Sequence, residues 1–97
     1  MATLHILHSS PCSTSEMENT LRLARPGDAI VLVQDAVFVF ISSPRDRALD
    51  DALAKGLKVF AMKADLDARS VKAPSGVETI GYRELVELIT RYEGTVS

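Results

Sequence analysis

The stretch A-I-V-L-V-Q-D-A-V-F-V-F-I, residues 29–41, decides the fold. Apart from the adjacent Gln34 and Asp35, every residue in it is apolar. A single strand of this length would reach roughly 40 Å at about 3.3 Å per residue, which exceeds the ~30 Å diameter expected for so small a domain. The chain must therefore turn inside the stretch, and Gln34 and Asp35 offer the only polar place to do so.

Residues 29–33 predict a strand that is buried on both faces, as is typical of a central strand in a parallel sheet. Gln34 and Asp35 then follow its carboxyl end, where open α/β sheets place their working residues. We interpret residues 36–41 as a short buried helix with Asp35 near its cap. The Val and Phe content of this segment favours a strand instead, so both alternatives stay open.

Strands and helices alternate along the rest of the chain. This order predicts one α/β domain over residues 1–97, with a small, mostly parallel four-stranded sheet and helices on both faces. The first and last strands are short, so we expect a partner chain to protect the edges, and the tail after Tyr92 to be frayed. The strands are expected at residues 4–7, 29–33, 57–62 and 77–80. The helices are expected after the caps Ser15, Ser43 and Asp65, with a last helix marked by Tyr82, Leu85, Val86 and Ile89.

Composition excludes several classes of protein. The chain has 97 residues, of which 46% are hydrophobic, and a net charge of −2, so it lacks the basic surface that a general grip on nucleic acid needs. The single cysteine cannot form an internal disulfide, which favours the reducing cytoplasm. The first eight residues, M-A-T-L-H-I-L-H, lack the basic region and long apolar stretch of a signal peptide. No apolar run approaches the roughly 20 residues of a membrane span. We therefore expect a cytoplasmic protein without direct nucleic-acid or membrane contacts.

Cys12 is the one candidate nucleophile. It follows the first strand and precedes a helix, where amide groups and the helix dipole lower the pKa of a thiol. Cys12 is then either a persulfide carrier or a small residue that fills a loop. His5, His8 and Cys12 form the pattern H-x2-H-x3-C, but residues three apart in a strand point to opposite faces, so we expect no metal site.

Three polar residues near strand ends are candidates for an interface or a functional loop, namely His8, Gln34 and Asp35. For Asp35 a cap, and for His8 a structural hydrogen bond, are the plainer alternatives. The chain has neither a G-x-G-x-x-G nor a G-x4-G-K-[ST] motif, so no cofactor is expected, and a small-ligand site rests on fold analogy alone. No catalytic triad can be assembled, so we expect no catalysis by this chain alone.

Four segments in order along the chain carry a family resemblance: L-H-I-L-H-S-S-P (4–11), G-D-A-I-V-L-V-Q-D (27–35), K-V-F-A-M-K-A-D-L-D-A-R (58–69) and I-G-Y-R-E-L-V-E-L (80–88). Together they resemble the DsrH/TusB family of sulfur-relay proteins. The resemblance implies a DsrE-like fold and a TusBCD-like heterohexamer with TusC-like and TusD-like subunits. It further implies that persulfide sulfur passes from a TusA-like donor to a TusE-like acceptor, towards 2-thiolation of the tRNA wobble uridine.

The resemblance leaves other functions open. In the Dsr branch a similar assembly serves sulfur oxidation. In this family the sulfur-carrying cysteine lies mainly on the TusD-like subunit, although some relatives have a cysteine in the first helix. The corresponding residue here is Thr20, which cannot hold a persulfide. Cys12 stands where similar chains have a bulky aromatic residue. The resemblance therefore implies a non-catalytic subunit, with a persulfide carrier that uses Cys12 as the alternative.

Overall fold

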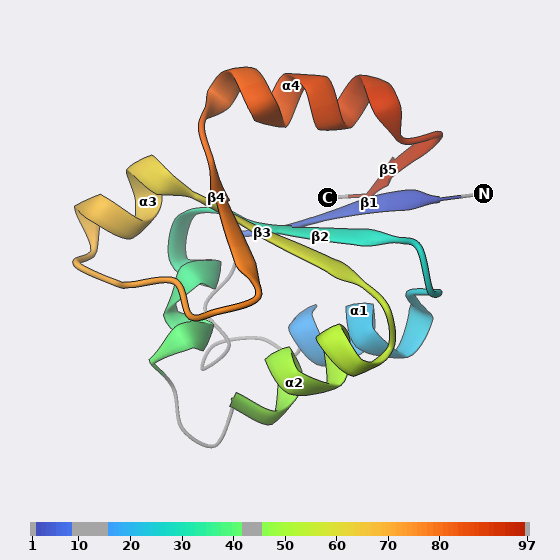
Figure 1. Ribbon diagram of the computed structural model, residues 1–97, viewed down its shortest axis with the longest axis horizontal. Helices are drawn as coiled ribbons and strands as arrows, with labels where there is room; N and C mark the ends of the chain where they lie inside the picture. The colour runs from blue at the N-terminus through green and yellow to red at the C-terminus, as the bar shows by residue number, and fades with distance from the viewer. Residues whose placement is uncertain (1, 9–15, 42–45, 97) are drawn as a thin grey trace.

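The computed structural model describes residues 2–8, 16–41 and 46–96, and in these ranges strands and helices alternate (Figure 1). The described strands form one parallel sheet in the order β4-β3-β2-β1-β5. The strands are β1 (Thr3–Leu7), β2 (Ala29–Leu32), β3 (Lys58–Met62), β4 (Val77–Ile80) and β5 (Gly94–Val96). The helices are α1 (Glu16–Leu23), the 3-10 helix η1 (Gln34–Phe40), α2 (Asp46–Ala54), α3 (Lys63–Ala68) and α4 (Tyr82–Arg91).

β2 is the centre of the sheet, as its apolar sequence predicts. All four of its residues are buried, and it pairs with β1 on one side and β3 on the other. Its side chains alternate between two cores. Ile30 and Leu32 join the core beneath α1, η1 and α2, whereas Ala29 and Val31 join the core beneath α4.

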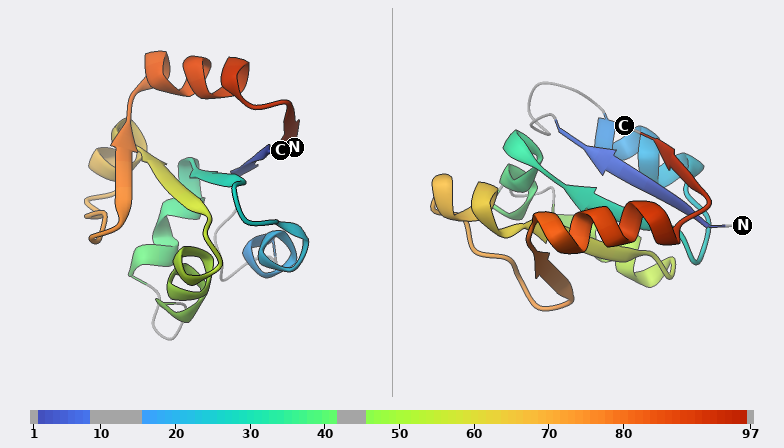
Figure 2. Two further views of the ribbon diagram at one scale, coloured as in Figure 1. Left: turned by 45° about the vertical axis from the view of Figure 1, so that its right-hand side comes forward. Right: turned by 90° about the horizontal axis from the view of Figure 1, so that it is seen from above.

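The two faces of the sheet are covered unequally (Figure 2). One face packs against α1, η1 and α2, with Leu66 of α3 in the same core, while among the described helices α4 alone crosses the other. Five strands spaced by about 4.8 Å are roughly 19 Å wide, but a helix with its side chains is only about 10 Å across. α4 therefore leaves part of this sheet face uncovered on both sides of the helix.

The sheet has five strands in the described chain, so the prediction of four was wrong. The tail that we expected to be frayed contains β5, which pairs in parallel with β1 from Thr3↔Gly94 to His5↔Val96. β1 is consequently an inner strand and needs no partner chain to protect it. The strands at the sheet edges are β4 and β5.

Residues 36–41 form a helix up to Phe40, which decides between the two alternatives. The neighbouring strands end at Leu7 and Met62, so a strand continued past β2 would find no partner for its backbone. The 3-10 helix instead buries Ala36 and Val37 under the sheet. Asp35 was expected near the cap of this helix. It lies in the first turn but does not cap the helix. The N-cap is Val33, and it makes no side-chain capping bond.

Other predicted helix signals have different outcomes. Gly56 ends α2 at a φ of +92°, with the backbone N–H groups of Gly56 and Leu57 donating to the carbonyls of Leu53 and Ala52. α3 begins at Lys63 after the N-cap Met62, so Asp65 lies in its first turn rather than at its cap. The predicted caps Ser15 and Ser43 lie outside the described residues.

Asp28 joins the start of β1 to the turn that follows α1. Its side chain is buried, with the residue 4% exposed. Oδ1 accepts a hydrogen bond from the Thr3 N–H at 2.9 Å, and Oδ2 accepts one from the Arg25 N–H at 3.0 Å. His5 Nε2 lies 3.2 Å from Oδ2 and, facing an acceptor, carries the proton in this pair.

The ionised form of Asp28 is favoured. Burial alone raises the pKa of this carboxyl, but the hydrogen bonds from Arg25 and Thr3 and the contact with His5 outweigh burial and hold the pKa below its ordinary value of 3.8. A folded-state pKa below the unfolded value stabilises the fold above the unfolded pKa. This stabilisation is lost as the pH falls through the folded-state pKa.

We predict that Asp28→Ala lowers the free energy of unfolding at pH 7 by about 2–4 kcal/mol, because the part-buried N–H groups of Thr3 and Arg25 lose a buried, ionised acceptor. Urea unfolding measures the change. Asp67→Ala is the matched control, since Asp67 pairs with Lys63 at the surface and should contribute below ~0.5 kcal/mol. The deficit of Asp28→Ala should shrink below about pH 4. Equal losses in both variants, or a pH-independent deficit, would contradict this account of Asp28.

Candidate functional site

The carboxyl edge of the sheet brings together the three residues singled out from the sequence. The Val33 N–H donates to the Leu7 carbonyl at 2.9 Å, so His8 and Gln34 leave neighbouring strands at the same edge. His8, Gln34 and Asp35 are all exposed. The strand register therefore places at one edge three residues that the sequence indicated only as lying near strand ends.

Arg69 completes this edge. Its Nε lies 3.0 Å from Asp35 Oδ1, and its Nη1 lies 3.4 Å from Asp65 Oδ1. Nη1 also lies 3.4 Å from the Asp65 carbonyl oxygen. Asp35 is more than half exposed, so these pairs contribute little to stability. Their effect is positional, because they join η1 to the end of α3.

Gln34 has a strained backbone. Its φ is +51°, in the left-handed region that residues with a side chain rarely adopt. This conformation turns the chain directly from β2 into η1 without an intervening loop. A glycine would make the same turn without the steric cost, so the glutamine side chain is retained at the expense of stability.

The thiol and metal hypotheses have separate outcomes. Cys12 lies outside the described residues. Thr20 lies in α1 and is only 9% exposed. His5 is held by Asp28 inside the fold, whereas His8 is exposed at the edge. In the part of the chain that the structure describes, no three His, Cys, Asp or Glu side chains cluster as metal ligands would.

α4 presents three different surfaces. Leu85 and Leu88 point to the sheet and pack in its core. Tyr82, Val86 and Ile89 recur at i, i+4 and i+7 and form an apolar flank, with exposures of 75%, 58% and 40%. The helix that Tyr82, Leu85, Val86 and Ile89 predict is confirmed as α4, and three of these four residues lie on its exposed flank.

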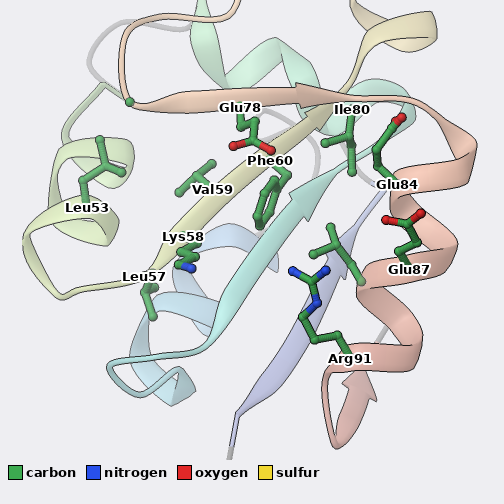
Figure 3. A pocket seen from close by; sticks show the side chains of 12 residues that line it. Leu53, Leu57, Lys58, Val59, Phe60, Glu78, Ile80, Glu84, Glu87 and Arg91 are labelled. Atoms are coloured by element: carbon green, nitrogen blue, oxygen red, sulfur yellow. The ribbon is translucent and has the colours of Figure 1, made fainter.

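The opposite flank of α4 borders a groove of about 540 Å³ (Figure 3). Glu84, Glu87 and Arg91 also recur at i, i+3 and i+7, but roughly half a turn around the helix from the apolar flank. Their side chains face β3 and β4 across the groove. Sequence reasoning missed this groove, because its walls come together only when α4 crosses the sheet.

No helix in the described ranges has both the length and the apolar character that crossing a bilayer requires.

Comparisons with known proteins agree on one family. Residues 9–95 match a family model described as "DsrH like protein". The chain is 35% identical over 91 residues to the proteins named TusB from Salmonella arizonae and Salmonella typhimurium, covering 90% of this chain and 94% of each relative. It also resembles the crystal structure of the ychN protein from E. coli, with a TM-score of 0.83 and 18% identity. That similarity covers 99% of this chain and 97% of the other, and it shows the fold alone.

We predict that Gln34→Gly raises the free energy of unfolding by about 0.5–1 kcal/mol, because glycine relieves the strain at a φ of +51°. Gln34→Ala is the control, since alanine removes the amide but keeps a Cβ and therefore the strain. Chemical denaturation of the three proteins gives the comparison. A Gln34→Gly variant no more stable than Gln34→Ala would show that the backbone at this position is relaxed.

Proposed function

Because the chain belongs to the DsrH/TusB family, we propose that it is a non-catalytic subunit of a TusBCD-like sulfur-relay complex that serves 2-thiolation of the tRNA wobble uridine. In this proposal it packs against TusC-like and TusD-like subunits in the cytoplasm. The sulfur-bearing cysteine belongs to a partner subunit, and the TusA-like donor and TusE-like acceptor act on the complex as a whole.

The observation that carries this proposal is the apolar flank of α4. Tyr82, Val86 and Ile89 have no apolar cover within the described chain, yet they form a continuous stripe on a well-packed helix. A stable subunit interface buries roughly 1,000 Å² or more in total and has an apolar centre. The α4 flank supplies such a centre, and a neighbouring subunit would supply its cover.

A non-catalytic role is supported by the residue that replaces the first-helix cysteine. Thr20 is buried, so this position offers neither a thiol nor access to a sulfur donor. The described residues of the carboxyl edge add an amide and an ion-paired network, Asp35–Arg69–Asp65, rather than a nucleophile. A persulfide carrier that uses Cys12 remains the second candidate, because its position before α1 favours a thiolate. A subunit that serves sulfur oxidation is the third.

We predict that Val86→Asp weakens co-purification with TusC-like and TusD-like chains from the same organism at least tenfold, because a carboxylate would be buried without a partner in the interface. The variant should fold normally, since Val86 is 58% exposed. Size-exclusion chromatography of the co-expressed chains measures assembly.

The control for Val86→Asp is Ser75→Asp, which places the same charge in an exposed loop away from α4. Ser75→Asp should assemble as the unchanged chain does. Normal assembly of Val86→Asp would remove the apolar flank from the interface. Failure of the unchanged chain to bind either partner would overturn the proposed function itself.

We also predict that Cys12→Ser leaves sulfur transfer through the assembled complex unchanged within twofold, because the transferred sulfur stays on partner cysteines. The measurement follows radioactive sulfur from a loaded TusA-like donor to a TusE-like acceptor. Mass spectrometry of this chain should find no added sulfur on Cys12. A persulfide on Cys12, together with lost transfer in Cys12→Ser, would instead establish the carrier.

A further inference from the structure

β4 is an edge strand whose outer side has no partner strand in the described chain. It pairs with β3 alone, from Val59↔Val77 to Met62↔Ile80. Glu78 and Thr79, in the middle of β4, are both exposed. The Val77 N–H donates to the Pro74 carbonyl, and beyond Val77 no described strand pairs with this side, which leaves it available to an added strand.

The groove described above lies directly beside this edge. Phe60, Ile80 and Leu88 line its apolar part, β4 forms one wall and α4 the other (Figure 3). A volume of about 540 Å³ is sufficient for several side chains. An extended segment on β4 would direct alternate side chains towards this groove.

Carboxylates dominate the walls of the groove. Glu78 on β4 faces Glu84 and Glu87 on α4. The Glu84 carboxylate accepts the Gly81 N–H at 2.9 Å, but those of Glu78 and Glu87 make no hydrogen bond or ion pair within the described ranges. Lys58 and Arg91 also line the groove, so its charged residues sum to one net negative charge.

We propose that the β4 edge and the groove beside it bind an extended, positively charged polypeptide segment from a partner protein. The segment adds to β4 as a further strand. Its apolar side chains contact Phe60 and Ile80, and its lysine or arginine side chains pair with Glu78 and Glu87. The opposite charges favour this occupant and orient it along the groove.

Two other occupants fit the groove less well. A second copy of this chain that paired edge to edge would bring Glu78 close to its own counterpart, and like charges across a strand pair are destabilising. A small molecule could fill the groove but would leave the β4 backbone unpaired. Only an extended cationic segment satisfies both the carboxylates and the backbone.

The test uses the full chain and a synthetic peptide, so its outcome is independent of the TusBCD-like partners. The probe is an acetylated and amidated peptide, seven residues long and fluorescently labelled. Lysine and valine take turns at its odd positions and threonine fills its even positions, so that lysine and valine side chains face the groove together. Fluorescence anisotropy should show binding that weakens as salt rises. A glutamate–valine peptide of the same length should bind at least tenfold more weakly.

Matched variants locate the peptide on the protein. The double variant Glu78→Lys and Glu87→Lys should weaken binding of the lysine–valine peptide by about tenfold or more, because two attractions become repulsions. Arg91→Gln should strengthen binding about twofold, since it removes a repelling cation from the groove. Glu93→Lys, an exposed substitution outside the groove, should change the affinity less than the double variant does.

A second probe tests the added strand. Methylation of alternate backbone nitrogens in the lysine–valine peptide keeps its charge but removes donors, and should abolish binding if the peptide pairs with β4. Undiminished binding of the methylated peptide would overturn the strand addition. Equal losses in Glu93→Lys and the double variant, or equal affinity for the acidic peptide, would overturn the site.

Discussion

The burial of β2 on both faces is the constraint on which this structure depends. A strand with no polar face must lie inside a sheet, and the sheet must be covered on both sides to keep the strand from water. The helical segments α1, η1, α2 and α3 contribute to the core on one face, but α4 has to cover the other alone. One helix is too narrow to cover five strands, so part of the sheet stays uncovered on each side of α4. Both surfaces that we connect with binding are therefore consequences of the same incomplete cover.

Much of the fold could be predicted because its signals are local. The apolar run at residues 29–41, its polar interruption and the helix stop at Gly56 each report on neighbouring residues. β5 could not be predicted in this way. Gly94, Thr95 and Val96 are too few to show a period, and they become a strand only because β1 offers a free edge from the far end of the chain.

The candidate site shows the same division. His8 and Gln34 were each expected at the carboxyl end of a strand, which needs only strand direction, and the parallel register places them at one edge. The pairing of Asp35 with Arg69 depends on how η1 and α3 approach each other, which no sequence period contains. α4 was predicted as a helix, but a period alone does not give the width of the sheet beneath it, so the exposure of its apolar flank could not be predicted. The structural role of Asp28 could not be predicted, because its two carboxylate oxygens accept hydrogen bonds from backbone N–H groups in two separate segments.

The place of β5 has a consequence for synthesis. β1 is synthesised before the other described elements, and its outer neighbour β5 is synthesised after all of them. Throughout that interval the nascent protein exposes an unpaired strand beside a nearly finished sheet, which is the condition under which chains associate wrongly. A domain of this kind is at its most vulnerable shortly before translation reaches Gly94.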